Sequence, residues 1–296
     1  MVFVITALGV IVFIRSFVRK SVESGLSPLN KLNEQIKRLS LAEESSLIHL
    51  AEPIEELLPI KESLNRFIDE NRKLYLREKR LASDISHELK TPIAELISLT
   101  EVVQKFPEDK DLKNNFAPEV FRISKRLKDI VSNILLLHKY QHAKLETNDV
   151  FDINQVIETL LAPLKDAKIV FVPDNNLPPV VSNLFAIETI LSNLIGNAVV
   201  HGMPGTPITI TTMPVDPDRI MVQVSNVPAV TLTTEDLNQF FDPLWQKDPS
   251  RTSAETYGLG LPIAAAFSNA ISAGLETSLK EQEIIFSLTI NVGTAD

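Results

Sequence analysis

A short stretch of the chain, residues 83–92, places a histidine among groups that can assist chemistry on it. It reads Ser-Asp-Ile-Ser-His-Glu-Leu-Lys-Thr-Pro. On a helix, His87 lies about 200° from the centre of the neighbouring apolar stripe, so we expect it to face solvent. A neutral imidazole is a competent nucleophile near pH 7, and Glu88 can take its second proton during attack. Thr91 lies one turn further on the same face, and Pro92 must bend the helix because it lacks an N–H.

A second stretch, residues 188–202, carries two asparagines one turn apart in an otherwise apolar helix. Asparagine is a poor helix former, and buried amides need hydrogen-bond partners. Mg²⁺ takes side-chain oxygens and keeps its waters and phosphates, so an amide oxygen that faces a nucleotide suits it. Asn193 and Asn197 are therefore candidate residues for binding a metal ion and phosphates. The alternative is that they form a simple helix-packing pair.

A third stretch, Tyr257-Gly258-Leu259-Gly260-Leu261-Pro262, ends a polar segment and opens an apolar helix. Glycines let the backbone approach a phosphate closely, and a proline suits the first turn of a helix. The stretch is thus a candidate phosphate-binding loop.

The composition excludes several classes of chemistry. The 296 residues include 29 Lys+Arg and 38 Asp+Glu, for a net charge of −9, which argues against nucleic acid as the main partner. The absence of cysteine excludes disulfides, thiolate nucleophiles and cysteine-based zinc sites. Only Gly9 and Gly25 precede Gly196, and 12 of the 18 prolines follow Asp149. This distribution favours a helical first half and a mixed α/β second half.

Two heptad runs separated by a polar break at residues 106–111 predict a helical hairpin. The first run contains Leu64, Phe67, Leu74, Leu81 and Ile85. The second contains Phe116, Val120, Ile123, Leu127, Ile130, Ile134 and Leu137. Such a hairpin exposes too much apolar seam for one chain, so we expect two chains to form a four-helix bundle.

The N-terminal segment is almost wholly apolar from Met1 to Ile14 and is followed by Arg15, Arg19 and Lys20. Extended to Val18 as a helix, it is roughly 27 Å long, close to a bilayer core of about 30 Å. The basic cluster predicts that the chain beyond it is cytoplasmic. We therefore predict a membrane helix, with a buried core helix as the alternative, in a chain that is the tail of a longer protein.

The region after residue 149 alternates strand and helix patterns, which predicts a mixed α/β domain. The expected strands are Lys168–Val172, Ile208–Thr212, Ile220–Val224 and Ile284–Ile290. The expected helices are Asn154–Leu164, Ala186–His201, Thr234–Phe241 and Pro262–Ser272.

The His-Glu-Leu-Lys-Thr-Pro sequence, on the first helix of a heptad hairpin, closely resembles the H box of sensor histidine kinases. The resemblance implies that His87 accepts a phosphoryl group, that Glu88 assists the transfer, and that Thr91 orients water for dephosphorylation.

The later stretches resemble the nucleotide-binding motifs of the same family. Residues 188–202 resemble the N box, which implies that Asn197 holds Mg²⁺ and that Asn193 and His201 lie near the nucleotide. Residues 257–262 resemble the G2 box, and Phe240–Asp248 resembles the F box. The further residues implied in ATP binding are Lys247, Arg251 in the ATP lid, Gly258, Leu259, Gly260 and Leu261.

One motif departs from the family pattern. The G1 box usually carries an aspartate that reads the adenine amino group, followed by Gly-x-Gly. Here Asn226 stands at the aspartate position, in the sequence Val-Ser-Asn-Val-Pro-Ala-Val, and no glycine follows. An amide oxygen can accept the same hydrogen bond, but without charge. We interpret Asn226 as a variant adenine-binding residue, and Val200 replaces a lysine that is common in the N box.

The resemblance covers about residues 60–292 and implies an α plus α/β architecture. We expect a transmembrane helix at 1–20, a HAMP-like linker at 21–70, a dimerisation and histidine-phosphotransfer domain at 71–146, and an ATP-binding α/β sandwich at 147–296. The implied partners are a second copy of the chain, the inner membrane in a single pass, and the receiver domain of a separate response regulator. ATP and Mg²⁺ are the implied cofactors, and the protein is also expected to act as the regulator's phosphatase.

Two other functions fit parts of the sequence. An ATPase or chaperone with the same nucleotide fold would need no phosphoacceptor helix. A signalling scaffold of the same fold, catalytically weak because of the altered G1 box, would not need Asn197, Gly258 and Gly260. A plain coiled-coil connector is the alternative to the HAMP-like linker.

Overall fold

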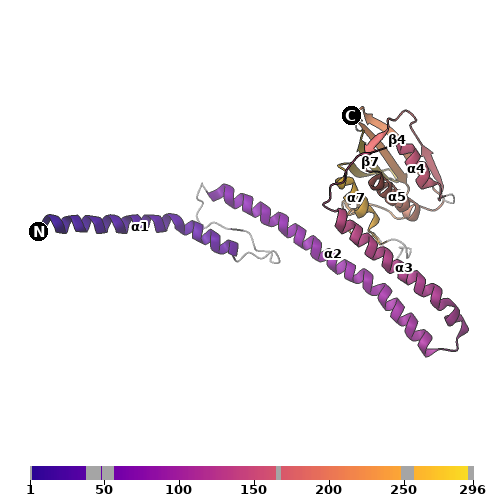
Figure 1. Cartoon of the computed structure of the whole chain (residues 1–296), viewed down its shortest axis with the longest axis horizontal. Helices are drawn as coiled ribbons and strands as arrows, with labels where there is room; N and C mark the ends of the chain where they lie inside the picture. Colours follow the sequence, from indigo (N-terminus) through magenta and orange to yellow (C-terminus); the bar gives the residue numbers. More distant parts are fainter. Residues whose placement is uncertain (1, 38–47, 49–56, 165–167, 248–256, 293–296) are drawn as a thin grey trace. The chain divides into compact units, whose positions relative to one another are not determined.

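The computed structural model describes residues 2–37, 48, 57–164, 168–247 and 257–292. Three long helices come first, and the α/β part follows (Figure 1). The chain divides into two compact units, residues 1–83 and 84–296.

The first unit contains α1 (Val2–Lys37) and the start of α2 (Leu58–Lys105). Pro28 lies inside α1, which continues without a break. Leu32, Ile48 and Ile68 form a small buried cluster. Phe67 and Leu74, expected in the heptad seam, are 61% and 51% exposed in the single chain, because Ile68 takes the buried position there.

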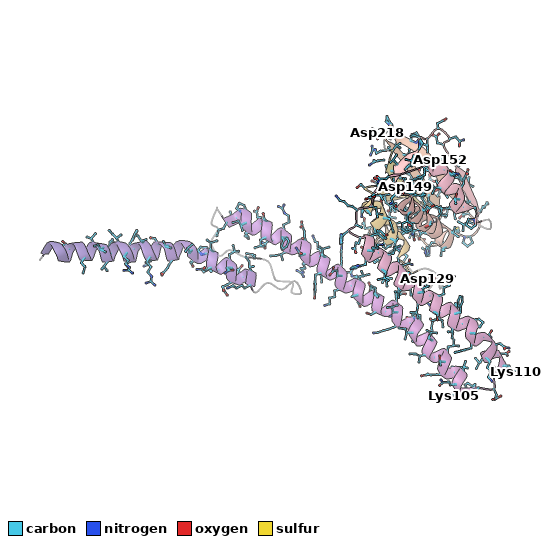
Figure 2. All side chains as sticks on the ribbon, viewed as in Figure 1. Lys105, Lys110, Asp129, Asp149, Asp152 and Asp218 are labelled. Atoms are coloured by element: carbon cyan, nitrogen blue, oxygen red, sulfur yellow. The ribbon has the colours of Figure 1, made fainter. Side chains whose placement is uncertain are left out.

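The predicted hairpin is confirmed by α2 and α3 (Lys110–Tyr140), which run antiparallel across a short loop between Lys105 and Lys110 (Figures 1 and 2). Asp109 caps α3, since its carboxylate accepts hydrogen bonds from the N–H groups of residues 111 and 112. The second heptad run faces inward, and Ile123, Ile130 and Leu137 are buried.

The α/β part contains a five-stranded sheet of order β2-β4-β5-β7-β6, in which only β2 and β4 are parallel. A second sheet pairs β1 with β3. The strands are β1 (Asp149–Phe151), β2 (Ile169–Val172), β3 (Val180–Ser182), β4 (Ile208–Asp216), β5 (Arg219–Asn226), β6 (Gly274–Lys280) and β7 (Glu283–Asn291). The helices are α4 (Ile153–Leu161), α5 (Leu184–His201), α6 (Thr234–Leu237) and α7 (Gly260–Ala270).

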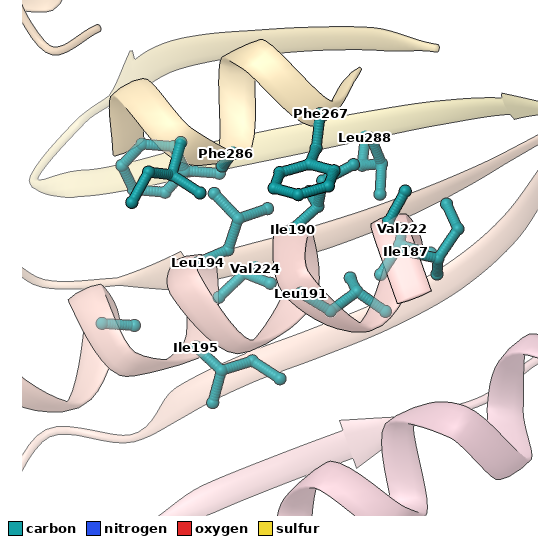
Figure 3. Packing of buried hydrophobic residues seen from close by; sticks show 14 of the residues in the cluster. Ile187, Ile190, Leu191, Leu194, Ile195, Val222, Val224, Phe267, Phe286 and Leu288 are labelled. Atoms are coloured by element: carbon teal, nitrogen blue, oxygen red, sulfur yellow. The ribbon is translucent and has the colours of Figure 1, made fainter. Parts of the chain in front are cut away.

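The core of this part lies between the five-stranded sheet and helices α5 and α7. Figure 3 shows Ile190 and Leu194 of α5 and Phe267 of α7 against Phe286 and Leu288 of β7. Alternate residues of β5 and β7 point to this face and are fully buried, as the period of two requires. The packing fixes α5, which carries the two asparagines, relative to the start of α7.

Three strands of the α/β part, β1, β3 and β6, are not predicted by the sequence pattern. The first two are three residues long and gain their pairing from each other across the chain, which local alternation does not reveal. The strand β6 starts at a glycine, has mostly polar residues and lies at the sheet edge beside β7. The expected helix at Thr234–Phe241 is shorter and ends at Leu237, after a capping box between Thr233 and Asp236.

Among the residues whose side chains the structure describes, which leave out residues 1–5 and 7 of the apolar N-terminal segment, α5 is the one helix that by length and composition could cross a membrane. Its apolar side chains are buried against the sheet, so it is the core helix of the α/β part. Along α1, in contrast, large apolar side chains are exposed, among them Phe13 at 70% and Phe17 at 64%.

Candidate functional site

The helix α5 holds Asn193 against the start of α7. The Asn193 side-chain N–H donates to the carbonyl of Thr189 at 2.8 Å, which satisfies one side of the amide. Its oxygen points at Gly260, where a Cβ would lie only 2.8 Å away. A glycine at position 260 therefore lets the loop before α7 approach the polar face of α5.

Gly258 is required by both conformation and space. Its φ is +64°, in the left-handed region that side chains disfavour. A Cβ would lie 2.6 Å from the carbonyl oxygen of Trp245, and that oxygen belongs to the backbone and cannot swing aside. The Leu244 N–H donates to the carbonyl of Gly258 at 2.9 Å, which joins the two loops.

These elements enclose a cavity of about 350 Å³ between α5, the end of β5 and the loop that enters α7. The structure brings most of the nucleotide-binding candidates to its wall, although they come from four separate segments. The wall includes Asn193, Asn197, His201, Asn226, Lys247, Gly258, Leu259, Gly260 and Leu261. Arg251 lies outside the described residues.

Asn226, the last residue of β5, is 3% exposed, and its side-chain oxygen is buried without a hydrogen-bond partner among the described atoms. Backbone bonds fix the segment around it, from Met203 N–H to the Val227 carbonyl at 2.7 Å and from Ala229 N–H to the His201 carbonyl at 2.9 Å. A buried acceptor without a partner costs about 1–3 kcal/mol. Asn226 thus brings to the cavity wall an unsatisfied acceptor that a ligand's N–H group could satisfy.

Two titratable groups border the same cavity. Partial desolvation at the cavity wall lowers the pKa of His201, which favours its neutral imidazole. Lys247 donates a short hydrogen bond to the carboxylate of Asp236, and this bond lowers the pKa of that carboxyl group. Asp236 also accepts from the N–H and hydroxyl groups of Thr233, at 2.7 and 2.8 Å. Lys247 is therefore held at the cavity wall by an anchored carboxylate.

His87 lies on the exposed face of α2, as its spacing predicted. The Thr91 hydroxyl lies 3.4 Å from the carbonyl of His87, a long hydrogen bond that confirms that the two residues share a face. Pro92 is buried within the helix, which continues past it to Lys105. His87, Glu88 and Thr91 are not among the described residues of the cavity wall, so the chain holds two separate candidate sites.

Several residues of the described cavity wall were not identified from the sequence, Asn133 among them, and Tyr257 was recognised only as part of the glycine stretch. Asn133 reaches the cavity from α3 of the hairpin, and Tyr257, only 9% exposed, precedes Gly258. Asn133 carries no local signal, because it sits beside the heptad position Ile134 on a helix distant in sequence. Tyr257 adjoins a recognisable glycine pair, but its burial depends on the packing of α3.

Comparisons with known protein families match both sites. Residues 77–143 match the His Kinase A (phospho-acceptor) domain, and residues 183–293 match the histidine kinase-, DNA gyrase B- and HSP90-like ATPase domain. The first range contains His87, and the second contains all of the described nucleotide-binding candidates.

Among curated proteins, the sensor histidine kinase CusS of Escherichia coli O157:H7 is 27% identical over 274 residues, which cover 88% of this chain and 55% of CusS. The probable sensor kinase SilS of Salmonella typhimurium is 24% identical over 257 residues, covering 83% of this chain and 51% of SilS. The chain thus spans about half the length of these relatives.

Solved structures show the same architecture. The Acinetobacter baumannii histidine kinase AdeS is 25% identical, with a TM-score of 0.54, over 70% of this chain and 98% of AdeS. The histidine kinase ThkA, solved in complex with the response regulator protein TrrA, is 18% identical with a TM-score of 0.61, over 82% of this chain and 68% of ThkA. With a phosphoacceptor helix followed by this ATPase fold, the chain belongs to the sensor histidine kinases.

Proposed function

We propose that the chain transfers the γ-phosphoryl group of ATP to His87 and then to an aspartate of a response regulator's receiver domain. An imidazole nitrogen of His87 forms the P–N bond as the bond from phosphorus to the bridging oxygen breaks and ADP leaves. Glu88 accepts the second ring proton. The observation that carries the proposal is the cavity, where candidates from the N, G1, F and G2 boxes meet in the chain that also exposes His87.

Within the cavity, the buried oxygen of Asn226 would accept a hydrogen bond from the adenine amino group. The glycine loop from Gly258 to Leu261 and the N-terminus of α7 would face the phosphates, where backbone N–H groups and the helix dipole favour anions. Asn193 and His201 would border the phosphates and the nucleotide. Lys247 and Arg251 would supply cations to the phosphates.

Asn197 fits a Mg²⁺ ion that is held mainly by phosphates and water. In the described residues no group of three or more acidic, histidine or cysteine side chains could hold a metal ion, so the amide oxygen of Asn197 would act together with nucleotide oxygens. Bound there, Mg²⁺ would neutralise the charge that builds up on the transferred phosphoryl group.

We propose that the kinase works as a homodimer at the inner membrane. The hairpin exposes large apolar side chains, including Ile97 at 54%, Phe121 at 72% and Leu135 at 65%, which a second copy would cover in a four-helix bundle. The exposed apolar surface of α1, followed by Arg15 and Arg19, suits a single membrane pass with the catalytic part in the cytoplasm. Residues 21–70 would relay the signal as a HAMP-like linker.

The direct test is incubation of the chain with γ-labelled ATP and Mg²⁺, followed by addition of receiver domains from candidate regulators. Label that appears on the chain and then moves to a receiver supports the proposal. A chain that binds ATP and takes no label would instead be a scaffold of the same fold.

We expect Thr91 to affect removal of the phosphoryl group more than its addition. The Thr91 hydroxyl is held only loosely, at 3.4 Å from the His87 carbonyl, so it can turn to orient a water molecule. Thr91→Ala should keep autophosphorylation and slow dephosphorylation of the regulator, by roughly tenfold if one positioned group is lost. Time courses of autophosphorylation and of regulator dephosphorylation measure the two rates.

Thr100→Ala is the matched control, because the Thr100 hydroxyl bonds the carbonyl of Leu96 in the same one-turn geometry, at 2.7 Å, and is also exposed. It should change neither rate. If Thr91→Ala lowers both rates together, the residue has a structural role instead.

We expect Asn226 to set the affinity and selectivity for the base. A neutral hydrogen bond contributes about 0.5–1.5 kcal/mol and a charged one about 1.5–3, so Asn226→Asp should tighten ATP by up to about tenfold. Asn226→Ala should weaken the binding of ATP. The amide also offers an N–H donor, so the wild type should discriminate against GTP less than Asn226→Asp does.

Calorimetric titrations of ATP and GTP measure these changes. Ser225→Ala is the control, since Ser225 alternates with Asn226 on β5 and lies on the opposite face of the sheet. Unchanged ATP affinity and unchanged ATP/GTP ratio in both Asn226 variants would show that the side chain does not touch the base.

A further inference from the structure

The helix α3 of the hairpin lies against α7 of the ATPase domain (Figure 1). The side chains at the two ends of this contact differ in kind. Toward the end of α3, Leu137 is buried and the Tyr140 ring packs on Phe267 of α7, with centroids 4.4 Å apart. Two heptads earlier, the same face carries Arg126, a charged residue. The contact is thus apolar at one end and ionic at the other.

Arg126 joins the two helices of the hairpin to the nucleotide loop. Its guanidinium carbon lies 5.6 Å from the centre of the Tyr257 ring, within the range of a cation–π contact. One of its terminal N–H groups donates to Glu95 of α2 at 3.5 Å. Tyr257 is buried, lines the cavity and directly precedes Gly258, so Arg126 contacts the loop proposed to hold the phosphates.

At this charged end, some polar atoms lack hydrogen-bond partners. The Arg126 Nε atom and one Glu95 carboxylate oxygen are buried without hydrogen-bond partners, and the Arg126 side chain as a whole is only 18% exposed. The nearest further cation to that oxygen, Arg122, is 3.9 Å away. Buried charged groups with unpaired polar atoms are costly, whereas the apolar end carries no such penalty. The ionic end is therefore the part of the contact that opens most easily.

The arrangement in which this contact is made does not suit phosphoryl transfer within the chain. Asn133 of α3 forms part of the cavity wall, while His87 is absent from the described wall. The reacting nitrogen must come within about 3–3.5 Å of the phosphorus, so transfer within one chain requires the hairpin and the ATPase domain to shift relative to each other.

We propose that Glu95, Arg126 and Tyr257 form a latch that restrains the ATPase domain, and that the latch opens around the apolar contact at Tyr140. Arg126 is a positioning residue that acts through Tyr257 and does not touch the nucleotide. The effect on rate rests on the proposed kinase function, whereas the restraint itself does not.

The test compares the full chain with Arg126→Ala and Glu95→Gln by two readouts: hydrogen exchange of the amides at 257–261, and the initial rate of autophosphorylation. Loss of a cation–π contact should raise both by roughly three- to tenfold in Arg126→Ala. Glu95→Gln should raise the exchange rate and the autophosphorylation rate less. The double variant should show no larger increase than Arg126→Ala alone, because both changes open the same latch.

Lys125→Ala is the matched control: it removes an exposed cation next to Arg126 on α3, whereas the ion pairs of Glu95 are with Arg122 and Arg126, and it should leave both readouts unchanged. A variant with a damaged fold would be labelled more slowly. A faster labelling rate in Arg126→Ala therefore indicates that the latch has opened and that the fold is intact. Unchanged or slower exchange at 257–261 in Arg126→Ala overturns the proposal, as does a slower rate. If the wild type takes no label, the kinase proposal fails, and the exchange data still decide whether the restraint exists.

Discussion

Replacing His87 by glutamine should abolish labelling of the chain by γ-labelled ATP. Glutamine keeps a polar side chain on the exposed face of α2, so the helix should be unaffected, but its amide is not a nucleophile. The label on the wild type should be stable in alkali and lost in acid, as a phosphorus–nitrogen bond requires. The expected loss is complete, because the amide cannot accept the phosphoryl group in place of the imidazole.

The control is His138→Gln, which changes another exposed histidine of the hairpin, on α3. It should be labelled like the wild type, and both variants should bind ATP equally, as read from the emission of Trp245, the only tryptophan, which lines the cavity. Label that persists in His87→Gln would remove this residue from the acceptor role.

Replacing Gly258 by alanine should reduce ATP affinity by more than tenfold. The left-handed backbone alone costs an alanine about 1–2 kcal/mol. The added Cβ would also lie 2.6 Å from the Trp245 carbonyl oxygen and 2.9 Å from the Leu244 carbonyl carbon, so the two backbone segments must separate. Since both segments border the cavity, its phosphate side should lose its shape. ATP titration by calorimetry, with a thermal melt of the same sample, measures both effects.

Gly205→Ala separates strain from steric clash. Gly205 has a similar φ of +85°, but a Cβ there would meet nothing within 4 Å. This variant should lower the melting temperature slightly and leave ATP affinity within about twofold of the wild type. Equal losses of ATP affinity in the two variants would show that backbone strain, and not the contact with Trp245, controls the cavity.

The chemistry and the order of the elements are readable from short stretches of sequence. The side-chain periods of helices and strands are local, so the heptads from Phe116 to Leu137 predict α3, and the spacing at His87 predicts its exposure. Motif resemblance works for the same reason, because each box is contiguous. It identified nine of the residues that the fold gathers at the cavity, from Asn193 to Leu261.

Features that depend on contacts between distant segments could not be read in this way. The sequence shows that Asn226 departs from its family, but the burial of its oxygen follows from the packing of β5 between β4 and β7. Lys247 is a candidate phosphate cation in sequence, yet it faces Asp236, eleven residues earlier, because the α6 cap holds that carboxylate in place.

The residues that link the two domains carry no local signal at all. Arg126 and Glu95 look like ordinary charges on solvated helix faces, and they become a partly buried pair beside Tyr257 because α3 packs on the ATPase domain. Burial and partner choice are properties of the assembled fold, since a side chain's surroundings come from segments that are often far away along the chain. Residue type and spacing therefore specify which reactions the chain can perform, and long-range packing specifies how its groups are held and restrained.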